Sequence, residues 1–305
     1  MRGRAFRFWV SSWAGVCSVL AYAGSVWAFD GLFSHVRVDR SLAAGFQDSD
    51  TEADVQDGFL IGVGRERVRR LPDGRLSIER WRRYTAVRNA DTHAVAKLPE
   101  PWSVHANVLL EPTLRVIRVD TRFDFKPSGD HVFSDTTLSE KYKWLFEADH
   151  TLLRAVDQGR RLQLQSFRQG KGVKQQTYDY PVGSAPLDVV GLVLALAVQR
   201  SVDQFDFDLI APDGSVHGIE AKVTRTRDLR GFAKGYRVPK ERLVTPAPVA
   251  MVDMRLASPI KYLFFPHHFF MAFASEQPDQ LLMMWGGDPD TNLQAFRREP
   301  PRPEH

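Results

Sequence analysis

Apolar and polar residues alternate with a period of two along much of this chain of 305 residues. Such alternation is typical of β-strands that bury one face and expose the other. The clearest segment is 113–125, where charged residues alternate with four apolar positions, Ile117, Val119, Phe123 and Phe125. We therefore expect one face of this strand to be buried and the opposite face to be wet.

Turns rich in proline, aspartate and glycine separate this strand from others, as in an antiparallel meander. The pattern predicts further strands at 58–71, 75–87, 131–139, 142–146, 151–156, 161–167, 205–209, 216–224, 249–256, 260–265, 269–274 and 280–285. It predicts an irregular lead-in at 29–57, a polar connector at 90–101, a basic loop at 170–176 and a charged loop at 225–240.

The segment from Pro186 to Ser201 breaks this alternation, because Asp188 is the only charged residue between Leu187 and Val198. Proline suits the first position of a helix, and the helix dipole favours an acid in the first turn and a base, here Arg200, in the last. A helix that is apolar all round must be buried. At about 24 Å it is too short to cross a bilayer. We expect it to lie in the concave face of the sheet.

The expected fold class is α+β and mainly antiparallel β, with a curved open sheet (a half-barrel) that encloses one apolar helix. No internal repeat or change of composition divides the chain. We predict a signal peptide at 1–28, the irregular lead-in at 29–57, a single β-rich domain at 58–298 and a disordered proline-rich tail at 299–305.

The first 28 residues have the pattern of a secretory signal. Arg2, Arg4 and Arg7 precede an uncharged run from Phe8 to Val26, and the segment ends in Val26-Trp27-Ala28. Cleavage after Ala28 would place the protein in the periplasm of a Gram-negative-type envelope. The alternative is an uncleaved N-terminal segment that anchors the protein.

Cleavage changes the charge of the chain. The chain has 41 basic and 37 acidic residues, and the loss of three arginines leaves a net charge of +1. Net charge therefore gives no reason to expect a nucleic-acid partner. The only cysteine, Cys17, lies in the same segment, so the mature chain would have no disulfide and no thiolate metal site.

The predicted hairpin at 58–87 is rich in arginine, with Trp81 and Tyr84 interleaved. Such a pattern can bind nucleic acid or anionic lipid. Glu66 and Glu79 interrupt the basic run. The favoured interpretation is therefore the solvated outer face of a sheet.

The order of elements resembles the LolA/LolB-like scaffold of periplasmic carriers. It comprises an export signal, a long meander, an inserted apolar helix and a return to strands at 203–224 and 269–285. The resemblance covers about 58–298. In that family an open, strongly curved sheet wraps an apolar interior, and helices act as its lid. The resemblance implies a non-enzymatic binder or carrier of an acyl chain, a lipid or a lipidated protein, without cofactor or metal. Membrane contact and the oligomeric state stay open.

Twelve residues are expected to line the interior of such a carrier. They are Ile117, Val119, Phe123, Tyr142, Trp144, Leu192, Leu194, Leu196, Phe207, Ile219, Met283 and Trp285. Two non-enzymatic alternatives to a carrier stay open. In the first, the helix and the sheet pack together without a cavity. In the second, the protein is a structural or assembly factor that presents a sheet edge to a partner.

A catalytic alternative comes from 205–222, which resembles the PD-(D/E)xK nuclease pattern. The resemblance implies that Asp208 and Glu220 hold a divalent metal ion while Lys222 steadies the attacking water. Glu220 and Lys222 would project from the same face of a strand, as that site requires. The export signal and the near-neutral mature chain favour the carrier over the nuclease.

Overall fold

The computed structural model describes residues 45–88, 94–125, 148–168, 170–211, 215–258, 268–278, 280–286 and 293–298. Its strands form one sheet of fifteen strands in the order β8-β7-β6-β5-β4-β3-β2-β1-β15-β14-β13-β12-β11-β10-β9. Neighbouring strands are antiparallel except for the parallel pair β9 and β10. The predicted class, a mainly antiparallel open sheet with an enclosed helix, is confirmed.

The strands are β1 (Ser49–Asp57), β2 (Leu60–Arg70), β3 (Leu76–Arg88), β4 (Val95–Leu110), β5 (Val116–Asp124), β6 (Ala148–Val156), β7 (Arg161–Arg168), β8 (Gly172–Asp179), β9 (Ser184–Pro186), β10 (Gln204–Ile210), β11 (Val216–Asp228), β12 (Val244–Leu256), β13 (Phe269–Ala274), β14 (Leu281–Gly286) and β15 (Leu293–Arg297). The helix is α3 (Val190–Gln199), and the 3-10 turns are η3 (Asp157–Gly159), η4 (Leu187–Val189) and η5 (Lys240–Arg242).

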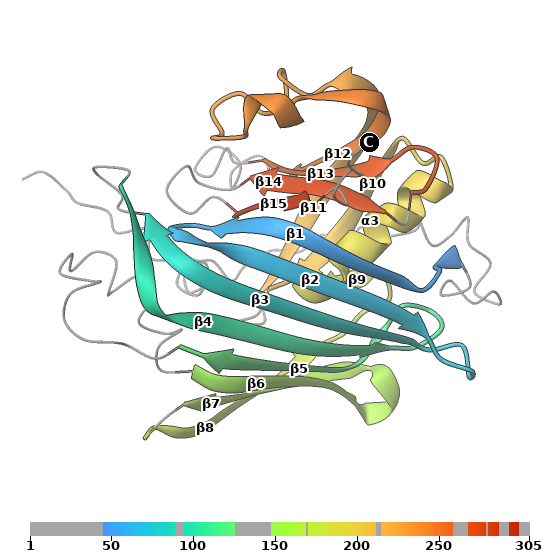
Figure 1. The fold of residues 1–305 in the computed structure, drawn as a ribbon. Coiled ribbons are helices and arrows are strands. Elements are labelled where there is room, and N and C mark those ends of the chain that lie inside the picture. Colours follow the sequence, from blue (N-terminus) through green and yellow to red (C-terminus); the bar gives the residue numbers. More distant parts are fainter. Residues whose placement is uncertain are drawn as a thin grey trace, which may run out of the picture.

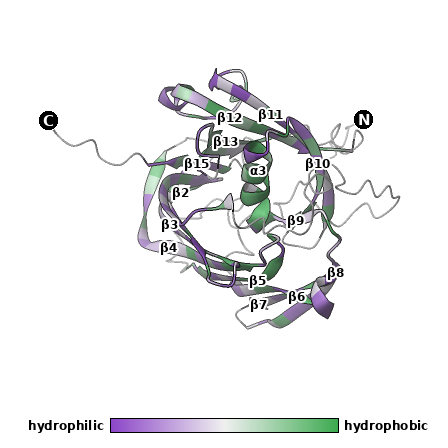
Figure 2. Cartoon of the chain, turned by 90° about the vertical axis from the view of Figure 1, so that its right-hand side faces the viewer, coloured by the Kyte–Doolittle hydropathy of each residue, from purple (hydrophilic) through white to green (hydrophobic). Residues whose placement is uncertain are grey.

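The course of the chain explains why the helix is enclosed. β1 to β8 run in sequence order from the middle of the sheet to one edge. The chain then passes through β9, η4 and α3, and β10 to β15 return from the other edge to pair with β1. Figures 1 and 2 show the sheet curving around α3. Only residues 180–183 separate the two edge strands, so the end of one edge lies close to the start of the other.

The hairpin predicted at 58–87 is confirmed. β2 and β3 pair from Leu60 opposite Val87 to Arg70 opposite Leu76. Gly74 has a φ of 84° in the turn, and its N–H donates to the carbonyl of Leu71 at 2.9 Å. A left-handed backbone is available to glycine without steric cost, which is why this turn ends in Asp-Gly.

The predicted helix is present but starts later than expected. Pro186 ends β9, Asp188 lies in η4, and the α-helix begins at Val190. Eight of its ten residues are buried, and Figure 2 shows the helix surrounded by strands. No helix in the described part of the chain is both long and apolar enough to span a bilayer.

Three buried apolar clusters hold the fold together. The first surrounds α3 and includes Val68, Ile78 and Val119 from one half of the sheet and Phe207 and Ile219 from the other. The second packs segment 229–243 against β12, β13, β14 and β15. The third joins β1, β2, β3 and β4 to Phe125. Burial of this apolar surface is the main term that stabilises the curved sheet.

Four stretches predicted to be irregular contain strands. Residues 49–57 of the lead-in form β1, and 95–101 of the connector belong to β4. The basic loop is part of β8, and the charged loop begins within β11, which runs to Asp228. The alternation rule missed β8 because all but one of its eight residues are exposed, so it has no apolar face.

Several predictions lie outside the described residues. These are the signal peptide at 1–28 with Cys17, the tail at 299–305, and the strands at 131–139, 142–146 and 260–265, including the residues Tyr142 and Trp144.

Candidate functional site

The inner face of the sheet, defined here as the side that packs on α3, is the candidate site. Side chains two positions apart along a strand share a face. Val68 and Ile78, which pair across β2 and β3, both belong to the cluster around α3. On β5, β6 and β7 the registers place Val119, Leu153 and Leu164 side by side on the same inner face.

A cleft of about 60 Å³ opens between η4 and the inner face of β5 to β8. Both edge strands contribute to it, with Tyr178 from β8 and Pro186 from β9. The other lining residues are Val119, Thr121, Thr151, Leu153, Leu164, Leu187, Asp188, Ile210 and Ala211. Leu187 is 42% exposed, and Leu153 and Leu164 are half-buried. The cleft is therefore an incompletely covered apolar surface.

The cleft is small compared with the pockets that hold organic ligands. Such pockets measure about 300–1,000 Å³, and 60 Å³ is close to the volume of about two water molecules. The space around α3 itself is filled, because Leu194 and Ala197 are 0% exposed. A chain-like ligand would therefore lie along the inner face of β5 to β8, with η4 shifting outward, rather than replace α3.

One polar contact links η4 to the sheet. Arg80 of β3 donates through Nη1 to the carbonyl of Asp188 at 2.5 Å, and the same nitrogen lies 3.9 Å from the Asp188 carboxylate. Arg80 also pairs with Glu66 of β2. Neither η4 nor α3 has a side-chain hydrogen bond at its N-cap. Among the described residues, Arg80 thus gives the η4 wall of the cleft a polar contact with the sheet, beside the apolar packing of Val189.

A second polar group lies further along the inner face. Arg82 Nη1 is 3.3 Å from the Asp57 carboxylate, and the Tyr84 hydroxyl donates to the same carboxylate at 3.1 Å. Desolvation, together with the charge of Asp57, raises the pKa of Tyr84. For Arg82, desolvation opposes the charge, but interaction with the Tyr84 oxygen and with the charge of Asp57 outweighs it and raises the pKa. Tyr84 therefore stays neutral and Arg82 charged at all physiological pH values.

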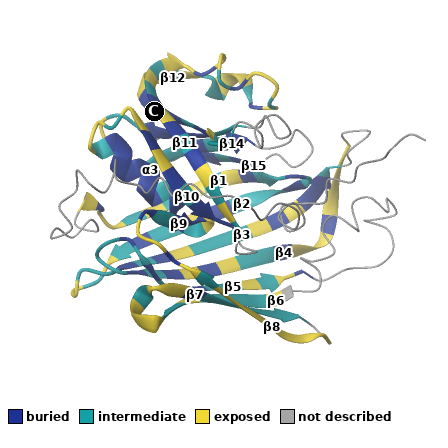
Figure 3. Ribbon diagram, turned by 180° about the vertical axis from the view of Figure 1, so that it is seen from behind, coloured by how far each residue is buried: buried dark blue, intermediate teal, exposed yellow. Residues whose placement is uncertain are grey.

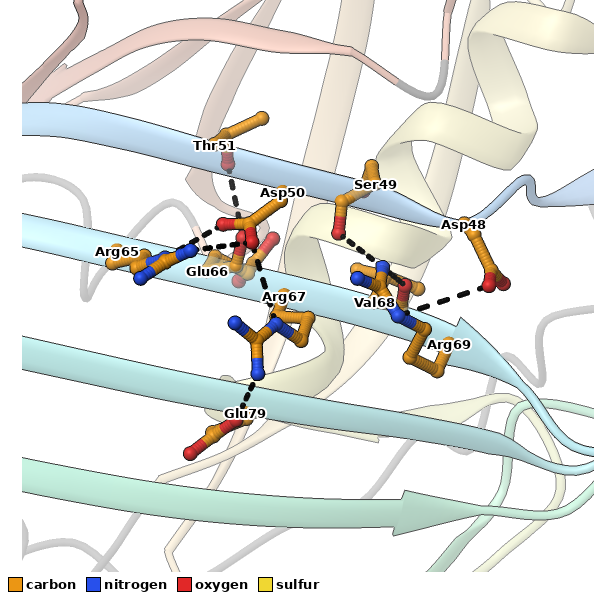
Figure 4. A network of polar contacts seen from close by, with 10 residues as sticks. All are labelled: Asp48, Ser49, Asp50, Thr51, Arg65, Glu66, Arg67, Val68, Arg69 and Glu79. Carbon is orange, nitrogen blue, oxygen red and sulfur yellow. Dashed lines mark hydrogen bonds and ion pairs between the residues drawn. The ribbon is translucent and has the colours of Figure 1, made fainter.

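The prediction of a solvated outer face holds for Arg65, Arg67 and Arg69 of this hairpin and is wrong for Arg80 and Arg82, which lie on the inner face. Figure 4 shows Arg65, Arg67 and Arg69 on β2 with acids from the neighbouring strands. Arg65 pairs with Asp50 at 2.6 Å, Arg67 with Glu79 at 3.3 Å, and Arg69 with Asp48 at 3.7 Å. Their odd-numbered positions lie opposite to Val68, which faces α3.

Six of the predicted interior residues share the cluster around α3: Val119, Leu192, Leu194, Leu196, Phe207 and Ile219. Phe123 is half-buried against the third cluster. Ile117 belongs to none of the three clusters. Between the pairs Leu109–Arg118 and Leu110–Val116 the register shifts, which leaves Ile117 as the extra residue of a β-bulge.

The prediction for Met283 and Trp285 was wrong. Both belong to the second cluster, on the outer face of β14, and Trp285 is 0% exposed there. Met284, between them, packs on the cluster around α3. The face was misassigned because β14 is apolar on both sides, since segment 229–243 covers its outer face.

Sequence analysis missed most of the cleft. Thr151, Leu153 and Leu164 lie on strands that were predicted, but their inward direction follows only from the register with Val119. The alternation within 151–156 and 161–167 was the available signal.

The residues of the nuclease pattern lie on the outer face of the antiparallel pair β10 and β11. Asp208 is opposite Gly218, and Glu220 is opposite Asp206 and bonds to Arg255 at 2.7 Å. Burial raises the pKa of Asp208. No group of three or more histidine, cysteine, aspartate or glutamate side chains in the described residues could hold a metal ion.

No family model and no curated protein matches the chain. The chain is similar to a solved structure described as a beta-barrel-like protein of domain of unknown function DUF1849 from Brucella abortus. The TM-score is 0.48 and the sequence identity is 8%, and the match covers 83% of this chain and 96% of that chain. This likeness concerns the fold and identifies no ligand. The resemblance to the LolA/LolB scaffold stays a prediction.

Proposed function

We propose that this protein is an exported, periplasmic envelope protein that binds an acyl chain, a lipid or a lipidated protein without catalysing a reaction. The observation that carries the proposal is the cleft between η4 and β5 to β8, with its half-buried leucines. Apolar surface that a sheet leaves incompletely covered favours an apolar ligand, because binding removes that surface from water.

The geometry supports a chain-like ligand better than a compact one. The inner-face residues Val119, Leu153 and Leu164 form a row across three strands. On the edge strand β8, Gln176 lies opposite Leu164, and Tyr178, two positions further along the same face, lines the cleft. A ligand could therefore enter between the edge strands β8 and β9 without disturbing the packing of α3.

The test measures uptake of a fluorescent fatty acid by the purified protein and by two variants. Leu153→Asp places a charge in the cleft and should abolish uptake. Leu152→Asp is the matched control, because Leu152 is also half-buried but pairs with Asp120 on the outer face. Mass spectrometry of a solvent extract should show a copurifying lipid.

Equal uptake by the two variants would remove the proposed site. Repeated recovery of a lipid-free protein that takes up no fatty acid would contradict the function. Fractionation of a cell that makes the tagged protein tests the location, and recovery in the cytoplasm would contradict export.

A further inference from the structure

The basic lobe, defined as residues 225–248, carries a larger net positive charge than the whole chain. Residues 225–242 contain seven cations and two acids, a net charge of +5, whereas the whole chain carries +4. The rest of the chain is therefore slightly acidic. The cations are Arg225, Arg227, Arg230, Lys234, Arg237, Lys240 and Arg242.

Buried apolar residues hold the lobe in place. Leu229, Ala233 and Val238 are 0%, 5% and 8% exposed in the second cluster, against the outer face of β12, β13 and β14. Figure 1 shows this segment, coloured orange, projecting beyond the rest of the sheet. These buried contacts hold the backbone of the lobe against the sheet, so its cations have defined positions.

Four of its cations are available to a partner. Arg230 pairs with Asp228 at 2.6 Å, and Arg242 donates to the carbonyl of Arg297 at 3.2 Å. Within the described chain, Arg225, Arg227, Lys234 and Lys240 are exposed and make no ion pair or side-chain hydrogen bond.

The lobe also exposes apolar residues beside these cations. Val244 is 56% exposed, and Pro246, Ala247 and Pro248 follow it as exposed residues at the start of β12. Figure 3 shows the exposed residues at the β12 end of the molecule. Basic residues next to exposed apolar ones are typical of surfaces that lie on a membrane.

We propose that the basic lobe docks the protein on an anionic lipid bilayer. Lysine and arginine near an anionic surface each strengthen binding by about fivefold. The proposal goes beyond the ligand-binding function and does not depend on it, since the lobe lies outside the cleft. A single-stranded nucleic acid fits less well, because it needs exposed aromatic rings on which to stack. The lobe's aromatic residues, Phe232 and Tyr236, instead pack edge-on against Phe270 at 6.2 and 5.9 Å.

The test is cosedimentation of the full protein with phosphatidylcholine vesicles, with and without phosphatidylglycerol. We expect binding only with phosphatidylglycerol, and weaker binding as salt is added. The lobe variant changes Arg225, Arg227, Lys234 and Lys240 to glutamine. At about fivefold for each cation, the loss of all four should weaken binding by several hundredfold.

The control variant changes two exposed arginines and two exposed lysines elsewhere, Arg83, Arg200, Lys97 and Lys174, to glutamine. It removes the same charge and should bind nearly as well as the unchanged protein. Equal losses in the two variants would overturn the proposal, because net charge alone would then explain binding. Tighter binding to an oligonucleotide than to anionic vesicles would also overturn it.

Lys234→Gln with Lys240→Gln provides a smaller change should the fourfold variant fail to fold. It should weaken vesicle binding measurably, and unchanged binding would contradict the proposal. Fatty-acid uptake should be the same in all of these variants, so a failure of docking is distinguishable from a failure of the cleft.

Discussion

Arg80 and Asp188 lie 108 positions apart in the sequence, yet the Arg80 guanidinium donates to the Asp188 carbonyl at 2.5 Å. The contact joins the middle of β3 to the turn that leads into α3. It links the half of the chain that builds the first eight strands to the segment that fills their concave side. The arrangement of the cleft therefore depends on an interaction that no local sequence pattern predicts.

Arg80→Met should lower the free energy of unfolding by about 1–3 kcal/mol, the usual effect of removing a charged partner from partly buried hydrogen bonds. Methionine retains much of the length of arginine but cannot bond to Asp188 or to Glu66, whose carboxylate would lose this partner. Urea unfolding measures the change.

The matched control is Arg67→Met on the outer face. The Arg67 side chain is 39% exposed while it pairs with Asp50 and Glu79. Its loss should therefore lower the free energy of unfolding by only about 0–1 kcal/mol. Equal effects of the two substitutions would contradict the role assigned to Arg80.

Two glycines should respond to alanine in opposite directions. A Cβ on Gly62 would lie 1.9 Å from the carbonyl oxygen of Arg83, at a register shift between β2 and β3 where the backbones cannot separate cheaply. We expect Gly62→Ala to cost about 2–4 kcal/mol. A Cβ on Gly191 in α3 would meet nothing within 4 Å.

Gly191→Ala should therefore stabilise the protein by about 0.5–1 kcal/mol, the helix propensity difference between the two residues. Thermal unfolding of the two variants gives the comparison. A loss of stability in Gly191→Ala would show that the start of α3 is packed more tightly than described.

The sequence predicted the direction of a side chain correctly where one face of the strand is apolar and the other polar. Phe207 and Ile219 were placed correctly, because their strands have polar residues on the outer face. Trp285 was misplaced because β14 is buried on both faces, and periodicity cannot then assign a direction. β8 was missed for the opposite reason, since it is exposed and joins the sheet through backbone bonds to β7.

The Asp50–Arg65 pair should make stability depend on pH in the acid range. Hydrogen bonds and charge from Arg65 and Arg67 hold the pKa of Asp50 at about 2, below its ordinary value of 3.8. A depressed pKa means that the pair stabilises the fold above the ordinary value and that this contribution is lost as the pH falls from 3.8 towards about 2.

Asp50→Asn should therefore be less stable than the unchanged protein at neutral pH, and the difference should disappear in acid. Urea unfolding at a series of pH values measures it, and added salt should reduce the difference because the pair is partly exposed. Asp124→Asn is the control, since Asp124 is exposed and has no ion pair within the described chain. If the difference in stability between Asp50→Asn and the unchanged protein persisted in acid, the effect would come from packing and not from the ion pair.

Glu220→Ala separates the binding function from the nuclease hypothesis. Glu220 bonds to Arg255 on the outer face, and both partners are partly exposed, so the substitution should change stability by less than about 1 kcal/mol. Plasmid nicking with Mg²⁺ or Mn²⁺ should be the same for the variant and the unchanged protein. Glu79→Ala, which removes another ion-paired glutamate of the outer face, is the control for nonspecific effects. Metal-dependent nicking that disappears only in Glu220→Ala would establish Asp208, Glu220 and Lys222 as a catalytic site and would replace the proposed function.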